Sequence, residues 1–504
     1  MGDYFDVIVI GSGQGGTPLA QASANRGWRT ALVEAKHVGG TCINEGCTPT
    51  KTMIGSGRVA YTVCGAKAMG INFKRSTLQL NLETVRSRKR QMVDSFRGGS
   101  ERRLLDTKNL ELINGKARFK SKDEVDVLFH DTGESRTLKA ARYIFINAGC
   151  APAAANIQGF DSIDPLSMLD STSIMELDSV PRHLLVIGGG PIGVEFAQLF
   201  RRFGAQVTIV QRAAHLVPNE DVDISLEMEK ILKDDGITLY LGAKSQWFSS
   251  VPTGSIVLQI QTAEGDTKSL FVSHVLYAAG RTPNTADLNL LAAGVEVDGK
   301  GYIKVNDRLE TSASNVFAIG DIKGGPAFTH VSYDDFRVLK HNLLSSTSSG
   351  PISIKNRVLP YCVFTDPQLG RVGLTEKEAR TLYMPTNVSD DKFQAADYDV
   401  TPTTENPQSR QSNTRIDIAT MPMSYVARAL EISEPRGMMK AVIDRETDKI
   451  LGFAALGYEG GELMSTVQMA MQGGLSWRHL RDGVFAHPTM AEGLNNLFAK
   501  FGDD

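Results

Sequence analysis

The stretch DVIVIGSGQGG, residues 6–16, places three glycines in G-x-G-x-x-G spacing directly after an apolar, β-branched run. Such a run predicts a buried parallel strand. The residues that follow predict a helix, and TALVE predicts a second strand that ends at Glu34. In a unit of this kind the glycines allow a tight turn, the approach of a pyrophosphate and close packing of helix on strand, while the terminal acid binds a ribose. The segment therefore predicts a dinucleotide-binding unit built on Gly11, Gly13 and Gly16.

The same pattern recurs in HLLVIGGGPIGVEFAQLFRRFGAQVTIVQR, residues 183–212, with its glycines at Gly188, Gly190 and Gly193. Two such units predict two nucleotides, as a redox enzyme needs. Gln211 stands where the first unit has Glu34, and Arg212 follows it. Because no carboxylate repels a 2′-phosphate there and Arg212 can pair with one, the sequence favours NADPH over NADH. An ordinary surface arginine at position 212 remains the alternative.

A pair of cysteines lies between the two units, in GGTCINEGCTPTKTM, residues 39–53. Cys42 and Cys47 form a C-x-x-x-x-C motif, and Lys51 lies one helical turn beyond the second cysteine. A cysteine near a helix terminus and a lysine is typical of a low-pKa thiolate. Two buried structural cysteines are the alternative. Zinc is a poor interpretation because no second pair of ligands lies nearby, so we predict no metal site.

Further motifs, in a fixed order, identify a resemblance to a known family. They are INAGC (146–150), AAGRTPN (278–284), FAIGD (317–321), FTDPQLGRVG (364–373) and HPTMAE (487–492). With both glycine motifs and the cysteine pair, the chain resembles the pyridine nucleotide–disulfide oxidoreductases. That flavoprotein family includes glutathione reductase, dihydrolipoamide dehydrogenase and mercuric reductase.

The resemblance implies an α/β fold with two Rossmann-like domains and a C-terminal α+β dimerisation domain. The implied ranges are 1–150 and 283–350 for the FAD-binding domain, 151–282 for the NAD(P)-binding domain and 351–504 for the dimerisation domain. The implied FAD-binding residues are Gly11, Gly13, Gly16, Glu34, Gly40, Thr41, Lys51 and Asp321. The implied NAD(P)-binding residues are Gly188, Gly190, Gly193, Arg212 and Gly280.

The resemblance also assigns the catalytic roles. Cys42 matches the thiol that exchanges with the acceptor, and Cys47 matches the thiol that contacts the flavin. Lys51 and Glu195 match an ion pair near the flavin ring. His487 and Glu492 match an acid–base dyad that the other subunit supplies in this family, which implies a homodimer.

The composition of the 504-residue chain argues against nucleic acid and membranes as partners. A net charge of −3 gives no positive field for nucleic acid, and no apolar run reaches the roughly 20 residues that span a bilayer. Residues 1–6 carry no secretory signal, so we expect a cytoplasmic protein. Residues 385–415 are polar and are an insertion relative to the family. We expect a surface loop there, with a cap over a partner or substrate surface as the alternative.

The sequence thus predicts an FAD-dependent NAD(P)H:disulfide oxidoreductase that passes a hydride from the nicotinamide through FAD to a Cys42–Cys47 disulfide. The acceptor is a disulfide or a related small molecule. Three alternatives stay open: a metal-ion reductase similar to mercuric reductase, a dihydrolipoamide dehydrogenase that runs in the oxidative direction, and a flavin-bound interaction protein without catalysis. Glu45, between the two thiols, is expected either to raise the pKa of Cys42 and favour cationic acceptors or to be an ordinary solvated acid.

Overall fold

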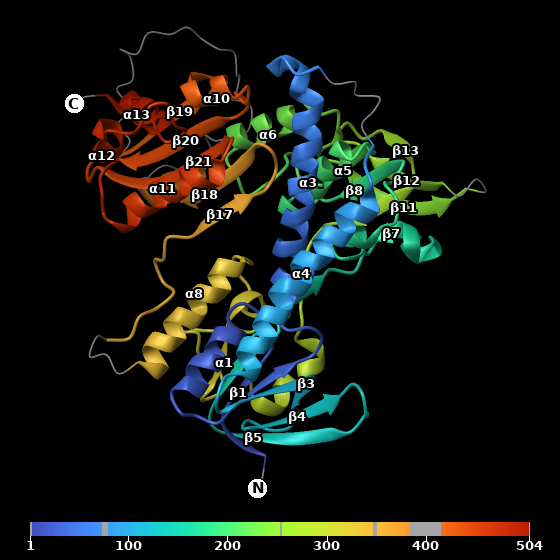
Figure 1. Cartoon of the computed structure of the whole chain (residues 1–504), viewed down its shortest axis with the longest axis vertical. Helices are drawn as coiled ribbons and strands as arrows, with labels where there is room; N and C mark the ends of the chain where they lie inside the picture. Colours follow the sequence, from blue (N-terminus) through green and yellow to red (C-terminus); the bar gives the residue numbers. More distant parts are fainter. Residues whose placement is uncertain (1–2, 73–78, 252–254, 346–349, 384–414, 503–504) are drawn as a thin grey trace. The chain divides into compact units, whose positions relative to one another are not determined.

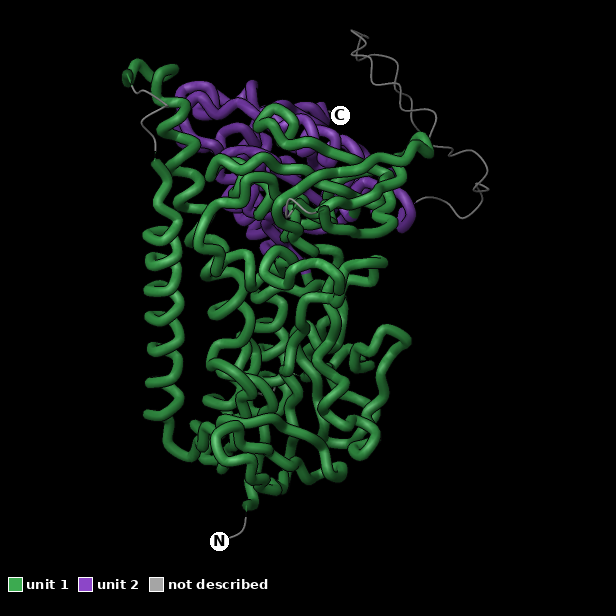
Figure 2. Tube along the Cα trace, turned by 90° about the vertical axis from the view of Figure 1, so that its right-hand side faces the viewer, with its two compact units in different colours: residues 1–218, 232–357 green, residues 219–231, 358–504 purple. Residues whose placement is uncertain are grey.

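The computed structural model describes residues 3–72, 79–251, 255–345, 350–383 and 415–502. The chain divides into two compact units, shown in green and purple in Figure 2. Unit 1 contains residues 1–218 and 232–357, and unit 2 contains residues 219–231 and 358–504.

The first dinucleotide unit forms as predicted, from β1 (Tyr4–Ile10), α1 (Gly16–Asn25) and β2 (Thr30–Glu34). All five residues of β2 are buried, which explains the continuous apolar run of a strand covered on both faces. β1 pairs in parallel with β2 on one side and with β5 on the other. The sheet is completed by β3 (Leu110–Phe119), β4 (Glu124–Phe129), β5 (Ser135–Ile146) and β16 (Val316–Ala318).

The second dinucleotide unit repeats this arrangement in a parallel sheet of order β10-β9-β8-β14-β7. Its glycine motif joins β8 (His183–Ile187) to α5 (Pro191–Arg202), and β9 (Gln206–Val210) follows. The other strands are β7 (Met168–Leu169), β10 (Thr238–Tyr240) and β14 (His274–Tyr277). Two smaller antiparallel sheets contain β11 (Lys244–Ser250), β12 (Ile256–Gln261), β13 (Thr267–Val272), β6 (Cys150–Pro152) and β15 (Arg281–Pro283).

The segment that carries the cysteine pair is helical. Cys42 lies in α2 (Gly40–Asn44), and Cys47 is the first residue of α3 (Cys47–Gly65). α4 (Leu82–Leu105) packs against α3, as Figure 1 shows, and also contacts α2. The remaining α-helices described in unit 1 are α7 (Leu290–Ala293) and α8 (Thr329–Leu339).

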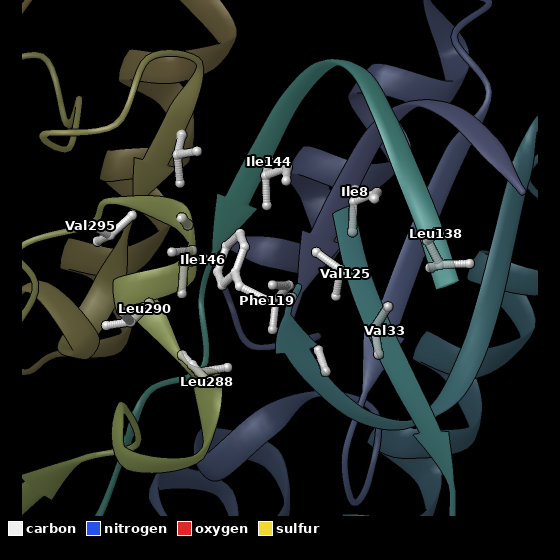
Figure 3. Packing of buried hydrophobic residues seen from close by; sticks show 14 of the residues in the cluster. Ile8, Val33, Phe119, Val125, Leu138, Ile144, Ile146, Leu288, Leu290 and Val295 are labelled. Atoms are coloured by element: carbon white, nitrogen blue, oxygen red, sulfur yellow. The ribbon is translucent and has the colours of Figure 1, made fainter. Parts of the chain in front are cut away.

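The core beside the first sheet joins segments that are distant in sequence. Figure 3 shows Phe119 and Ile146 from the sheet facing Leu288 and Leu290 from the segment that follows β15. These side chains are at most 7% exposed. Burial of this shared apolar surface holds the segment after residue 283 against the first sheet.

Unit 2 is an antiparallel sheet of order β17-β18-β21-β20-β19 with helices packed on it. Its strands are β17 (Pro360–Val363), β18 (Gln368–Gly373), β19 (Ile416–Pro422), β20 (Met438–Asp444) and β21 (Lys449–Gly457). Its helices are α9 (Glu376–Tyr383), α10 (Ala427–Glu431), α11 (Gly460–Gln472), α12 (Trp477–Asp482) and α13 (Gly493–Phe498). This is the α+β arrangement that the sequence predicts for the C-terminal domain.

Unit 2 also contains a buried group of charges. Arg371 on β18 is 2% exposed and binds Glu220 and, at 3.0 Å, Asp221. These two acids precede α6 (Val222–Asp234), although they lie in the sequence of the second dinucleotide unit. Lys440 on β20 reinforces the contact through an ion pair of 2.8 Å with Asp223. Paired charges therefore anchor residues 219–231 within unit 2.

The domain boundaries at residues 150, 282 and 350 stay a prediction. The polar insertion predicted at residues 385–415 lies, except for its last residue, outside the described residues.

The turn of the second dinucleotide unit shows why its glycines are needed. Gly188 has a φ of +112°, which side chains rarely adopt. A Cβ on Gly193 would lie 2.0 Å from the carbonyl oxygen of Gly188, so α5 packs directly on the turn. A Cβ on Gly190 would meet no atom within 4 Å.

These distances predict unequal effects of two alanine substitutions. We expect Gly193→Ala to lower the free energy of unfolding by about 3 kcal/mol, because the backbone of the turn must move. Gly190→Ala is expected to cost at most about 1 kcal/mol. Urea denaturation of both variants tests this, and equal stabilities would contradict the close approach.

Candidate active site

The first glycine-rich turn is held by Glu34. Its carboxylate accepts hydrogen bonds from the backbone N–H of Ser12 at 2.9 Å and from the Ser12 hydroxyl at 2.5 Å. It also accepts one from the backbone N–H of Lys36 at 2.8 Å. Glu34 is 8% exposed, so the acid predicted to bind a ribose also fixes the turn.

Gln211 does the same in the second turn. Its Oε1 accepts a hydrogen bond from the backbone N–H of Gly189 at 3.1 Å, as Glu34 does from Ser12. Its Nε2 donates to the carbonyl of His215 at 3.4 Å. An amide therefore replaces the carboxylate without loss of the turn's support, and the negative charge is absent. Arg212 beside it is exposed.

Asn147 joins the first turn to β5 and β16, and sequence reasoning missed this role although INAGC was singled out. With its amide oxygen turned toward the loop, it accepts hydrogen bonds from the N–H groups of Gly16 at 3.0 Å and Gly13 at 3.3 Å. Its amide nitrogen then donates to the carbonyl of Ile319 at 3.2 Å. An asparagine directly after a strand that pairs with the dinucleotide strand is the signal that could have shown it.

The residues predicted to hold FAD have the character that the group requires. A Cβ on Gly40 would lie 2.8 Å from the Cα of Gly13, so the two loops contact through glycine backbone. Burial raises the pKa of Asp321, and the charges of Arg281 and Lys323 oppose this shift. Asp321 lies inside the 3₁₀ turn Gly320–Lys323, whose N-cap is Ile319, so capping does not explain the acid. A half-buried carboxylate acceptor suits a ribityl hydroxyl.

Cys42 and Cys47 lie close together and share a hydrogen bond. Cys47 is exposed at the N-terminus of α3, where the helix dipole favours an anion, and Cys42 is half-buried. The hydroxyl of Thr329, the first residue of α8, lies 3.1 Å from the Cys47 sulfur. Thr329 was missed from sequence, because it is distant from the cysteine motif and belongs to none of the motifs considered.

The environment separates the two thiols in acidity. The hydrogen bond from Cys42, together with Thr329 and the charge of Lys51, lowers the pKa of Cys47 to about 6. The same hydrogen bond, together with burial, raises the pKa of Cys42. At pH 7 Cys47 is therefore the thiolate and Cys42 keeps its proton. Glu45 is not the cause of the raised Cys42 pKa; its carboxylate lies 3.9 Å from the Lys36 ammonium.

The predicted ion pair between Lys51 and Glu195 is present. The Lys51 ammonium donates to the Glu195 carboxylate at 2.7 Å, from α3 to α5. Glu195 is 5% exposed, so the pair is not an ordinary helix-surface contact. Gly57 permits this approach of the helices, because a Cβ there would lie 2.8 Å from the Leu199 side chain.

His487 and Glu492 also lie together, in unit 2. The Nδ1 atom of His487 lies 2.9 Å from the nearer carboxylate oxygen of Glu492, and the imidazole is 67% exposed. The carboxylate orients the ring and leaves Nε2 accessible. Gly280, predicted to contact NAD(P), is exposed at the end of the segment after β14.

Of the three other cysteines, Cys150 is buried, and Cys64 and Cys362 are half-exposed. Among the described residues no group of three or more histidine, cysteine, aspartate or glutamate side chains is arranged to hold a metal ion. None of the described helices is long and apolar enough to cross a membrane.

Comparison with known proteins agrees with this geometry. Residues 5–335 match the family model for pyridine nucleotide-disulphide oxidoreductases, and residues 359–407 and 403–498 match the model for their dimerisation domain. The chain belongs to this family, and it is an FAD-dependent oxidoreductase that acts on sulfur groups with a pyridine nucleotide. The non-catalytic alternative is therefore set aside, and the dimerisation domain supports the predicted homodimer.

Two curated relatives match almost end to end. The "Probable pyridine nucleotide-disulfide oxidoreductase RclA" of Escherichia coli is 34% identical, over 98% of this chain and 99% of the relative. The dihydrolipoyl dehydrogenase of Thermus scotoductus is 32% identical, over 97% of this chain and 96% of the relative. A solved Cu(II) complex of the HOCl-induced flavoprotein disulfide reductase RclA from E. coli is 32% identical, with a TM-score of 0.82, over 99% of this chain and all of that chain.

The Thr329 contact predicts a measurable change in the acidity of Cys47. Replacing Thr329 with valine removes the hydroxyl but keeps the volume. We expect the pH midpoint for alkylation of Cys47 by iodoacetamide in the reduced protein to rise from about 6 by roughly 1 to 2. Thr329→Ser is the control and should keep the wild-type midpoint. An unchanged midpoint in the valine variant would show that the hydroxyl has no role.

Proposed function

We propose that this chain is an NADPH-dependent reductase of small disulfides, with Cys42 and Cys47 as its redox pair. The observation that carries the proposal is the hydrogen-bonded dithiol itself, in which one thiol has a pKa of about 6 and the other a raised pKa. In such a pair Cys47 is a thiolate at neutral pH and Cys42 becomes a nucleophile once it loses its proton, as thiol–disulfide exchange requires.

FAD would be held by the first dinucleotide unit and the loop that precedes α2. The residues proposed to contact it are Gly11, Gly13, Gly16, Glu34, Gly40, Thr41, Lys51 and Asp321. When bound, FAD supplies two-electron chemistry between a nicotinamide and a pair of thiols. The Lys51 ammonium, one helical turn beyond Cys47 on α3, is held by an ion pair of 2.7 Å with the Glu195 carboxylate.

The exchange steps follow from the acidities of the two thiols. Cys42 loses its proton and attacks one sulfur of the acceptor disulfide, which releases the other sulfur as a thiolate and forms a mixed disulfide. The Cys47 thiolate then attacks the Cys42 sulfur, which releases the second acceptor thiolate and forms the Cys42–Cys47 disulfide. The acceptor gains two electrons, and the thiol pair loses them.

Proton transfer needs a base, because Cys42 keeps its proton at pH 7. We assign this role to His487, oriented by Glu492 at 2.9 Å. The imidazole removes the proton of Cys42 and then protonates the departing acceptor thiolate. In a homodimer of this family the histidine acts on the dithiol of the other subunit, so the active enzyme is a dimer.

NADPH is proposed as the nucleotide, bound by Gly188, Gly190, Gly193, Arg212 and Gly280. Gln211 supports the preference, because it holds the turn at Gly189 through an amide and leaves the strand end without a carboxylate. A 2′-phosphate then meets only the exposed Arg212 guanidinium. A cytoplasmic location remains a prediction from the sequence.

The nucleotide preference has a direct test. We expect Arg212→Ala to raise the KM for NADPH about 10- to 100-fold, because a charge-assisted hydrogen bond to the 2′-phosphate is lost, and to leave the KM for NADH unchanged. Arg182→Ala, at an exposed arginine of the same domain, is the control. An equal loss with both nucleotides would contradict a contact with the 2′-phosphate.

A metal ion is a second candidate acceptor, since the relative RclA of Escherichia coli has been solved as a Cu(II) complex. Thiolates bind and reduce copper readily, and Cys47 provides one. Because a relative is a dihydrolipoyl dehydrogenase, the experiment must also test the oxidative direction, in which a dithiol reduces the enzyme.

The acceptor is identified by mixing the NADPH-reduced enzyme, without oxygen, with glutathione disulfide, oxidised lipoamide and Cu(II) in separate experiments. We expect a disulfide to reoxidise the enzyme, and His487→Gln to slow that step about 100-fold or more while reduction by NADPH stays unchanged. Cys42→Ser should abolish disulfide turnover. Reoxidation by Cu(II) alone would select the metal-ion function, and reduction by dihydrolipoamide faster than by NADPH would select the oxidative direction.

A further inference from the structure

A line of hydrogen bonds runs from α4 through the middle of the cysteine motif to the first glycine-rich turn. It begins at Arg97, whose Nε donates to the Oδ1 of Asn44 at 2.7 Å. Asn44 is the last residue of α2 and lies between Cys42 and Cys47 in sequence. Arg97 therefore binds the segment that carries both thiols, although its own helix belongs to neither dinucleotide unit.

Asn44 uses its amide nitrogen on the other side. Its Nδ2 donates to the carbonyls of Gly40 at 2.9 Å and Val38 at 3.0 Å, with a longer contact of 3.4 Å to the carbonyl of His37. The amide nitrogen of Asn44 donates to backbone carbonyls, and its amide oxygen accepts from the guanidinium of Arg97. Arg97 thus fixes the orientation in which Asn44 binds the loop before α2.

That loop contacts the first glycine-rich turn directly. The N–H of Gly39 lies 3.2 Å from both the carbonyl and the hydroxyl oxygen of Ser12. Gly40 approaches Gly13 so closely that a Cβ would lie 2.8 Å from the Gly13 Cα. Loss of the hydrogen bonds of Asn44 would therefore displace both the glycine-rich turn and α2, which carries Cys42.

We propose that Arg97 is a positioning residue that acts through Asn44: it holds the Gly39–Gly40 loop against the turn proposed to bind FAD, and it holds Cys42 in hydrogen-bond contact with Cys47. The inference rests on the proposed function of the two thiols. The Arg97 side chain is 27% exposed. Its guanidinium also lies 3.8 Å from the carboxylate of Asp94, one helical turn earlier on α4.

The experiment uses the full-length protein purified with its flavin. In Arg97→Ala we expect FAD to dissociate about tenfold faster, because a charged hydrogen bond that holds the loop is lost. We also expect the pH midpoint of Cys47 alkylation to rise by about 1, since Cys42 no longer donates as well. Arg97→Lys should recover part of both effects. Arg102→Ala, at an exposed arginine on the same helix, is the matched control and should change neither.

A double-mutant cycle tests the route through Asn44. If Arg97 acts through Asn44, the Asn44→Ala and Asn44→Ala/Arg97→Ala proteins should lose FAD at equal rates. Additive effects, or an Arg97→Ala protein with wild-type FAD retention and a wild-type midpoint near 6, would overturn the inference and leave the proposed function intact. A wild-type midpoint near 9, the ordinary value for cysteine, would overturn the proposed function itself.

Discussion

The chemistry of this protein depends on one hydrogen bond between two thiols. Gly46 breaks the helix between Cys42 and Cys47, and a Cβ there would lie 2.9 Å from the Thr41 carbonyl, so the chain turns too tightly for any larger residue. The break lets α3 begin at Cys47, with its positive end at that sulfur. The interaction between the two thiols lowers the pKa of Cys47 and raises that of Cys42, and Thr329 and Lys51 lower the pKa of Cys47 further.

The two dinucleotide units show how one turn is stabilised by two chemistries. Glu34 and Gln211 occupy the same place and accept a hydrogen bond from the same backbone position of their turns. The support is common to both units, whereas the charge differs. Replacing a carboxylate with an amide is therefore a change that a fold can accept at little cost in stability, and nucleotide preference can vary independently of the turn.

Much of the fold was predictable because the glycine spacings are dictated by backbone contacts that no other residue permits. The second strand of the first unit lies at Thr30–Glu34, where the sequence placed it, and Lys51 meets Glu195 as the family resemblance implies. Thr329 and Asn147 were missed because each binds a residue far away in sequence. A single polar side chain creates no repeating pattern that would indicate such a contact. Of the two roles that the sequence leaves open for Glu45, an effect on the raised pKa of Cys42 is not found, because a neighbour in sequence need not be the nearest charge in space.

The anchoring of residues 219–231 by Arg371 and Lys440 limits how the protein can be dissected. The C-terminal sheet begins at Pro360, yet Arg371 is neutralised by Glu220 and Asp221, which lie far earlier in the chain. Lys440 pairs with Asp223 at the start of α6 and with Glu376 of its own segment. A fragment cut at the linear boundary would leave the buried Arg371 without Glu220 and Asp221, whereas Lys440 would keep Glu376. The C-terminal segment is therefore not an exchangeable module, and chimaeras with other members of the family must carry both pieces together.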